Sequence, residues 1–194
     1  MDASLSTRDR IVGAATELFW RKGYGSTSIA DILETAKVNS GSLYYFFKGK
    51  QELLVAVLEA YRDGIDTMLL EPAWGKVEDP IEKIFALLAT YRRLLDESEC
   101  FYGCPIGSLA LEIHEPDPDI RELMAANFAA WTSAVRRCLE QADLLPDTDH
   151  QALAELILTV MEGGVMQTRT FRDLGYFDRA VGQLRIHIHG LKRA

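Results

Sequence analysis

The stretch that decides the fold is KVNSGSLYYFFKGK, residues 37–50, where four consecutive aromatic residues stand between small polar residues and lysines. Asn39 is a typical helix N-cap, because its side-chain oxygen can accept a hydrogen bond from a free backbone N–H of the first turn. We therefore expect a short helix from about Ser40 to Phe47, ended by a glycine two residues later. Leu43 and Phe47 are four residues apart and share one face of this helix, which we expect to be buried.

Two further helices are predicted before this one. Between Arg8 and Lys22 the apolar residues recur with helical spacing, and they are Ile11, Ala15, Leu18 and Phe19. Ser28 and Asp31 have the spacing of a capping box and open a second, shorter helix. A longer helix followed by two short helices with a tight turn between them is a helix-turn-helix.

The rest of the chain continues the helical periodicity. We expect a helix from Lys50 to Leu70 and a loop from Glu71 to Glu78. Proline fixes a helical φ where no N–H bond is needed, so three pairs are typical of helix starts: Asp79-Pro80, Cys104-Pro105 and Asp117-Pro118. Thr148 and Gln151 predict a capping box for a helix to about Phe171, and Gly175 separates it from the last helix. The prediction is an all-α fold of about nine helices, with an N-terminal three-helix head and a C-terminal helical body.

Charge is distributed unevenly along the chain. The net charge is −8, yet residues 1–50 contain seven Lys and Arg against five Asp and Glu. The remainder contains 14 Lys and Arg against 24 Asp and Glu. Because the phosphate backbone of DNA attracts local positive charge, we interpret residues 1–50 as a DNA-binding domain and residues 51–194 as a domain with another partner.

Composition restricts the compartment. The chain has 194 residues, of which 48% are hydrophobic and 26% charged, as is usual for a soluble globular protein. It contains no apolar run of about 18 residues and no signal-peptide pattern, so we expect no membrane partner. Its three cysteines are too few for a disulfide framework and fit a reducing environment. The expected localisation is the cytoplasm.

The quoted helix has the side chains that reading a DNA groove requires. Close approach to the major groove needs small residues at the N-terminal end, and these are Ser40, Gly41 and Ser42. Tyr44 and Tyr45 carry hydroxyls that can reach bases or phosphates, although both rings could instead simply pack. Lys50, at the start of the next helix, can hold a phosphate.

Residues 7–54 resemble the DNA-binding head of TetR/AcrR-type transcriptional regulators. The motifs are F-x-x-x-G-Y at Phe19 to Tyr24, T-S-I-x-x-I at Thr27 to Ile32 and G-S-L-Y-Y-x-F-x-x-K at Gly41 to Lys50. The resemblance implies a homodimer that binds a palindromic operator, usually as a repressor, and releases it when a small molecule binds the body.

By the same resemblance, Thr27 and Tyr45 contact phosphates, and Ser40, Gly41 and Tyr44 lie nearer the bases. Position 46 is a departure from the family pattern, because phenylalanine stands where the family usually has histidine. Phe46 cannot donate a hydrogen bond to a phosphate.

The body offers a candidate effector site but no catalytic set. Inward stripes of three helices carry large apolar residues that either line a ligand pocket or form the core: Leu88, Tyr91, Phe128, Trp131 and Met161. The four histidines are scattered, and no phosphate loop or nucleophile elbow is present. We expect no enzyme activity, no cofactor and no metal.

Cys104 belongs to a distinctive segment, FYGCPIGSLALE, residues 101–112. At a helix N-cap the free N–H groups favour a thiolate, and some regulators of the resembled family with a similar segment are thought to respond to electrophiles or oxidants. Cys104, with Cys100 as a partner, is therefore a candidate redox pair. The alternative is that Cys104 is a small buried packing residue.

The last two helices are candidates for a dimer interface. Gly163 and Gly164 permit close helix approach, and two such helices from each subunit would form a four-helix bundle, unless they pack only within one subunit. The prediction is an effector-controlled repressor. Three alternatives remain. One is a repressor that senses electrophiles through Cys104, and another is a helical small-molecule-binding protein that has lost DNA binding, for which Phe46 is the only clue. The third is an enzyme with a helical pocket.

Overall fold

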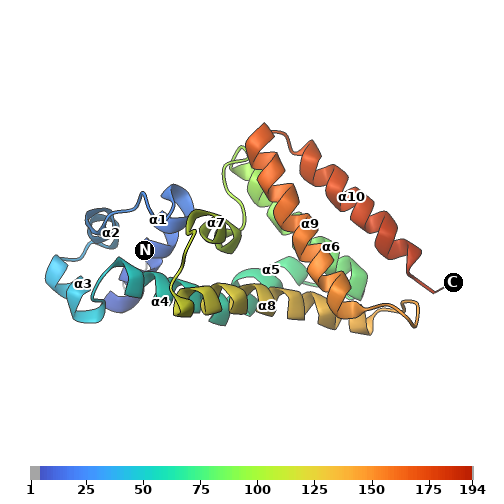
Figure 1. Cartoon of the computed structure of the whole chain (residues 1–194), viewed down its shortest axis with the longest axis horizontal. Helices are drawn as coiled ribbons and strands as arrows, with labels where there is room; N and C mark the ends of the chain where they lie inside the picture. Colours follow the sequence, from blue (N-terminus) through green and yellow to red (C-terminus); the bar gives the residue numbers. More distant parts are fainter. Residues whose placement is uncertain (1–4, 194) are drawn as a thin grey trace. The chain divides into compact units, whose positions relative to one another are not determined.

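The computed structural model describes residues 5–193, and in this range the chain forms ten α-helices and one π-helical segment (Figure 1). Residues 1–4 and 194, at the outer ends of the two predicted domains, lie outside the described residues. The elements in chain order are α1 Thr7–Lys22, α2 Ile29–Ala36, α3 Ser40–Phe46, α4 Lys50–Asp63, η1 Asp66–Leu70, α5 Glu71–Trp74, α6 Pro80–Glu97, α7 Pro105–Glu112, α8 Pro118–Gln141, α9 His150–Phe171 and α10 Gly175–Gly190. The all-α prediction is confirmed, with one α-helix more than expected.

The described chain divides into two compact units. The first contains the chain up to Asp63 together with Pro105–Asn127, and so holds α1 to α4, α7 and the first part of α8. The second contains Gly64–Cys104 and the chain from Phe128 onward. The segments on either side of the Cys104–Pro105 peptide bond therefore belong to different units.

The first unit is built around α1, which packs against α2, α3, α4 and α7. The predicted caps are confirmed: the Asn39 side chain accepts a hydrogen bond from Ser42 N at 2.8 Å, and Ser28 and Asp31 form a complete capping box. Leu43 and Phe47 are buried, with 0% and 4% of their surface exposed, as their spacing predicted. This burial fixes α3 to α1 by one face and leaves its other face outward.

The second unit is built around α9, which packs against α6 and α10. Figure 1 shows α9 and α10 side by side over most of their lengths. They approach closely at Gly164, where an added Cβ would lie 3.0 Å from the Phe177 ring. Two ion pairs join α6 to α10. They form between Arg92 and Asp178 and between Glu82 and Arg185.

Two local predictions were wrong. The helix expected from Lys50 to Leu70 ends at Asp63 and is followed by the π-helical segment η1, while a turn of helix, α5, occupies part of the expected loop. The cap of α9 is Asp149 rather than Thr148, because the Asp149 carboxylate accepts hydrogen bonds from the backbone N–H groups of Gln151 and Ala152. A charged acceptor is the stronger cap.

Candidate nucleic-acid interface and effector site

The turn between α2 and α3 is short and tightly bonded. Lys37 ends α2 in the left-handed conformation, with φ of 54°, and its N–H donates to the carbonyl of Glu34 at 3.2 Å. Val38 N donates to the carbonyl of Leu33 at 3.1 Å, and Asn39 then caps α3. The chain therefore turns within the three residues from Lys37 to Asn39, and hydrogen bonds hold this turn. They give α3 a defined position on the first unit.

The outward face of α3 carries aromatic rings with polar ends. Tyr44 is 55% exposed and Tyr45 is 82% exposed, so neither ring is part of the core. Ser40 and Gly41 are exposed at the N-terminal end and Ser42 is half-buried. Phe46 is 39% exposed and packs edge-on against Tyr45, with ring centroids 4.9 Å apart. Phe46 thus supports the ring of a predicted phosphate contact.

Thr27 and Lys50 have internal partners that the sequence did not reveal. The Lys50 ammonium donates to the carbonyls of Tyr24 at 2.8 Å and Thr27 at 2.9 Å, and lies 4.4 Å from the Tyr24 ring centroid. Thr27 is 1% exposed and its hydroxyl donates to Gly23 O at 2.7 Å. Both side chains therefore stabilise the turn between α1 and α2. Their contacts with phosphates stay a prediction.

Two other lysines flank α3 and were not among the predicted contacts. Lys37, just before the helix, is exposed. Lys48, just after it, has a side chain that is 90% exposed, with its ammonium 3.4 Å from the Glu52 carboxylate. An exposed pair of this kind is weak and readily exchanged for another anion. Their positions at the two ends of α3 were the available sequence signal.

A carboxylate at the end of α7 also holds the α1–α2 turn. The Glu112 side chain accepts hydrogen bonds from the backbone N–H groups of Tyr24 at 2.8 Å and Gly25 at 2.6 Å. Burial, followed by the charges of Asp117 and Glu112, raises the pKa of the Tyr24 phenol. The last residue of α7 is therefore bonded to the turn that Lys50 also holds.

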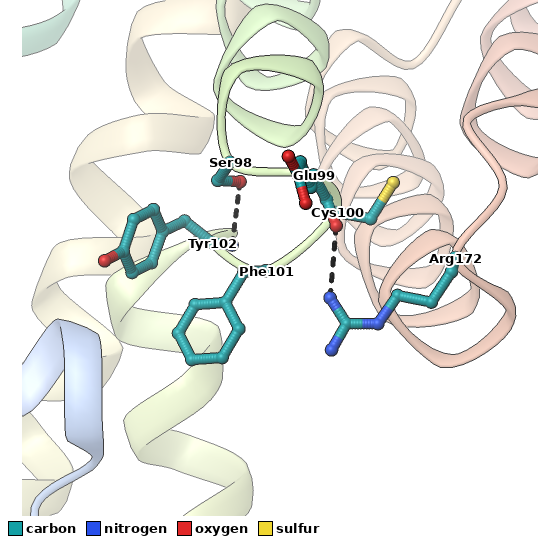
Figure 2. Close-up of a pocket in the computed structure, with 6 residues that line it drawn as sticks. All are labelled: Ser98, Glu99, Cys100, Phe101, Tyr102 and Arg172. Carbon is teal, nitrogen blue, oxygen red and sulfur yellow. Dashed lines mark hydrogen bonds between the residues drawn. The ribbon is translucent and has the colours of Figure 1, made fainter.

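In the second unit, the loop before Cys104 has a strained backbone beside a surface hollow of about 720 Å³ (Figure 2). Glu99 and Cys100 have φ of 51° and 61°, in the region that L-residues rarely adopt. Two contacts hold this conformation. The Ser98 hydroxyl accepts a hydrogen bond from Tyr102 N at 2.9 Å, and the Arg172 guanidinium donates to the carbonyl of Glu99 at 3.1 Å.

Gly103 brings the end of this loop against α9. A Cβ at this position would lie 2.3 Å from Val165, so only glycine allows the approach. Cys104 follows directly, and its thiol lies within hydrogen-bonding reach of the Glu162 carboxyl, one turn before Val165 on α9, and of the Tyr91 hydroxyl. The close approach at Gly103 therefore sets the surroundings of Cys104.

Four polar side chains meet in this region, which we call the polar cluster: Tyr91, Cys104, Trp131 and Glu162. Burial raises the pKa of Tyr91, and the neighbouring Cys104 and Glu162 raise it further. Burial also raises the pKa of Glu162, while its contact with Cys104 opposes the shift. Trp131 Nε1 and Glu162 Oε1 are buried without a hydrogen bond of normal geometry.

Two of the predicted effector residues, Tyr91 and Trp131, belong to the polar cluster. Leu88, Tyr91, Trp131 and Met161 are at most 6% exposed, and Phe128 is half-buried. Sequence reasoning missed Glu162, because a glutamate in an amphipathic helix usually faces solvent. Cys100 and Cys104 are both buried and neither forms a disulfide. Among residues 5–193, no group of His, Cys, Asp and Glu side chains is arranged to hold a metal ion.

The outer face of α9 and α10 carries an apolar groove of about 480 Å³, whose lining includes Leu156, Val160, Gly163 and Leu184. Nothing lies within 4 Å of the Cβ position of Gly163, so the groove is open there. Large apolar side chains on the same two helices are exposed: Leu156 at 43%, Met166 at 51% and Ile186 at 67%. No helix of the described chain is long and apolar enough to cross a membrane.

Comparison with known proteins gives matches in both parts of the chain. The family described as bacterial regulatory proteins, tetR family, matches residues 11–57. The family described as transcriptional regulator LmrA/YxaF-like, C-terminal domain, matches residues 80–183. The second match alone covers more than half of the chain.

Individual relatives agree with these matches. The HTH-type transcriptional regulator Rv0196 of Mycobacterium tuberculosis is 30% identical over 186 residues, which cover 92% of each chain. YxaF of Bacillus subtilis is 29% identical over 168 residues, covering 86% of this chain and 87% of YxaF. The transcriptional repressor NemR of Escherichia coli is 29% identical over 140 residues, covering 70% of this chain and 66% of NemR. The solved reduced form of NemR superposes with a TM-score of 0.78 at 21% identity, covering 92% and 94% of the two chains. The chain with the KVNSGSLYYFFKGK stretch is a member of the TetR family of bacterial transcriptional regulators.

Proposed function

We propose that this protein is a repressor that binds a palindromic operator as a homodimer and releases it when a small apolar or aromatic effector binds in the second unit. Residues 1–50 recognise DNA and residues 51–194 bind the effector and the partner subunit. Family membership supports the general scheme, and one relative, NemR, is named a repressor.

The outward face of α3 is the observation that carries the DNA-binding proposal. Its buried residues hold the helix on α1, and its exposed Ser40, Gly41 and Tyr44 are small or polar groups suited to base edges. Tyr45 and the flanking lysines Lys37 and Lys48 contact phosphates on either side. Lys50 and Thr27 act through the turn that they stabilise, because their polar groups already have internal partners.

The groove on α9 and α10 supports the homodimer. An apolar face of this kind in a monomer is unusual unless a partner covers it, and a second copy would supply the same face through a twofold axis. Two copies of α9 and α10 then form a four-helix bundle. The two α3 helices would enter major grooves about 34–36 Å apart or at a multiple of that spacing.

We assign the coupling between effector and DNA to α7. This helix follows Cys104 directly in the chain and ends at Glu112, whose carboxylate holds the α1–α2 turn. An effector that displaces Cys104 pulls on the first residue of α7, and the displacement reaches the turn through Glu112. The helix that follows Lys50 is a less direct route, because α4 ends at Asp63 and is followed by the π-helical segment η1.

Fluorescence anisotropy with labelled DNA from upstream of the protein's own gene tests the proposal. Specific binding requires that this DNA binds at least about a thousandfold more tightly than a scrambled duplex at physiological salt. Equal affinity for both duplexes would contradict the repressor proposal and favour a helical small-molecule-binding protein that has lost specific DNA binding. Mass measurement at micromolar concentration decides the dimer, because a monomeric mass refutes it.

The electrophile-sensing alternative has weaker support. A reactive cysteine needs positive surroundings that favour the thiolate, whereas Cys104 is buried beside the Glu162 carboxyl. A carboxylate repels a thiolate, so we expect the Cys104 thiol to be slow to react. Labelling of the native protein with a maleimide checks this, since rapid modification of Cys104 with loss of DNA binding would favour the alternative.

A further inference from the structure

The polar cluster lacks a hydrogen-bond donor for one of its buried oxygens. Trp131 is 4% exposed, and its indole N–H makes no hydrogen bond of normal geometry, although the Tyr91 hydroxyl lies close by. Cys104 is within reach of the Glu162 carboxyl, but Glu162 Oε1 is buried without a partner. An unpaired buried polar group destabilises the folded protein, and for a charged group the cost is larger. Such groups call for a functional explanation.

The three neighbours of Glu162 in this cluster are neutral, so its carboxylate has no cation there. The pKa of Glu162 responds to its burial and to its contact with Cys104, and to no lysine or arginine in residues 5–193. The rings of Tyr91 and Trp131 belong to the same cluster. The Glu162 charge acts on Tyr91, and Trp131 contacts Tyr91 in turn. A carboxylate with a buried, unpaired oxygen and an aromatic ring nearby attracts a cation, because the charge and the negative ring face act in the same direction.

We propose that the effector is an organic amine, protonated at neutral pH and carried on an apolar or aromatic body, whose ammonium donates to Glu162. This inference rests on the proposed function. The ammonium supplies the donor that Oε1 lacks, and the rings of Tyr91 and Trp131 lie beside it. The apolar body packs against Leu88 and Met161, which lie next to Tyr91 and Glu162 along α6 and α9. An anionic ligand is repelled, and a neutral alcohol supplies a donor without the charge.

A matched ligand series tests the charge of the effector. The probes are 2-(1-naphthyl)ethylamine, 2-(1-naphthyl)ethanol and 1-naphthylacetate, which share the ring system and differ at the polar end. Their dissociation constants are measured by isothermal titration calorimetry on the full-length protein. A hydrogen bond to a charged group contributes about 1.5–3 kcal/mol, so we expect the amine to bind about tenfold or more tighter than the alcohol and the acetate to bind weakest.

Variants locate the preference. Glu162→Gln keeps the shape of the side chain and should lose about tenfold in affinity for the amine while its affinity for the alcohol is unchanged. Glu155→Gln, an exposed position on the same helix, is the matched control and should behave as wild type. Circular dichroism confirms that each variant is folded. Glu162→Asp retains the charge and should retain the preference for the amine.

Three results would overturn the proposal: equal binding of amine and alcohol, a full amine preference in Glu162→Gln, or no binding of the amine at millimolar concentration. Anisotropy with the upstream DNA is run on the same wild-type sample. If this DNA binds specifically and the amine preference is absent, the inference alone fails. If specific DNA binding is absent, the proposed function itself fails.

Discussion

Removing the ammonium of Lys50 should weaken the fold of the first unit before it affects any phosphate contact. Lys50→Met keeps the apolar stem but removes two hydrogen bonds to carbonyls and the contact with the Tyr24 ring. Hydrogen bonds of charged groups contribute about 1.5–3 kcal/mol each when well shielded, and Lys50 is half-buried. We therefore expect the free energy of unfolding to fall by about 2–3 kcal/mol, or about 5–10 °C in Tm for a chain of this size.

Lys48→Ala is the matched comparison, because Lys48 is two residues away and exposed. Its stability should be within about 0.5 kcal/mol of wild type. Each phosphate contact contributes about 0.9 to the slope of log affinity against log salt, so a dimer that loses Lys48 twice should lose about 2 units of slope. Lys50→Met should bind the operator more weakly at every salt concentration while its slope stays at the wild-type value.

Urea unfolding followed by circular dichroism gives the stabilities, and anisotropy at five salt concentrations between 50 and 300 mM gives the slopes. The reasoning is refuted if Lys50→Met has wild-type stability and a reduced salt slope. That result would make Lys50 a direct phosphate contact, as its place in the family motif implies, with its internal hydrogen bonds exchanged on binding.

Tyr44→Ala should change the preference among operator variants, measured as the ratio of affinities for single-base substitutions, and an equal loss on all of them would contradict base contact. Glu112→Gln keeps one oxygen acceptor and places an amide donor against the other backbone N–H, so one hydrogen bond becomes neutral and one is lost; this costs at least about 1 kcal/mol and should lower operator affinity at least about fivefold in anisotropy without changing the salt slope. Leu156→Glu should give a monomer in sedimentation at micromolar concentration, whereas Leu111→Glu, at a more exposed leucine in the first unit, should leave the dimer intact. Glu162→Gln should be more stable than wild type at pH 7 and equal to it near pH 4 in urea unfolding. The pKa of Glu162 is raised in the folded wild type. The stability of the wild type is therefore complete below the pKa that this glutamate has in the unfolded chain, and part of it is lost as the pH rises through the folded pKa.

Local sequence signals predicted the head of this protein well. Asn39 and Ser28 cap their helices because each side chain bonds to a backbone N–H three residues further along the chain. The burial of Leu43 and Phe47 follows from spacing within one helix. Each of these features depends on neighbours in the chain, and the pattern of a single sequence contains that information.

The internal hydrogen bonds of Lys50 and the burial of Glu162 were not predictable in this way. Lys50 bonds to carbonyls 23 and 26 residues earlier, and a lysine at a helix start beside aromatic residues is equally typical of a phosphate contact. Glu162 is a carboxylate in an amphipathic helix, and its burial depends on the approach of a loop that begins some 60 residues earlier. Gly103 was the one local sign of that approach, but a glycine in a loop has many explanations.

The proposed coupling through α7 depends on how firmly its two ends are held. Its eight residues rise about 12 Å, and its hydrogen-bonded backbone moves as a rigid rod. At one end the preceding residue, Cys104, is held by the polar cluster, and at the other end Glu112 holds two backbone N–H groups at 2.6 and 2.8 Å. Because these hydrogen bonds are short, we expect a shift of Cys104 either to move the α1–α2 turn or to break the Glu112 contacts. The same turn also binds the Lys50 ammonium at the start of α4. We therefore expect a displacement of about 1 Å at either end of α7 to break these hydrogen bonds and to lower operator affinity.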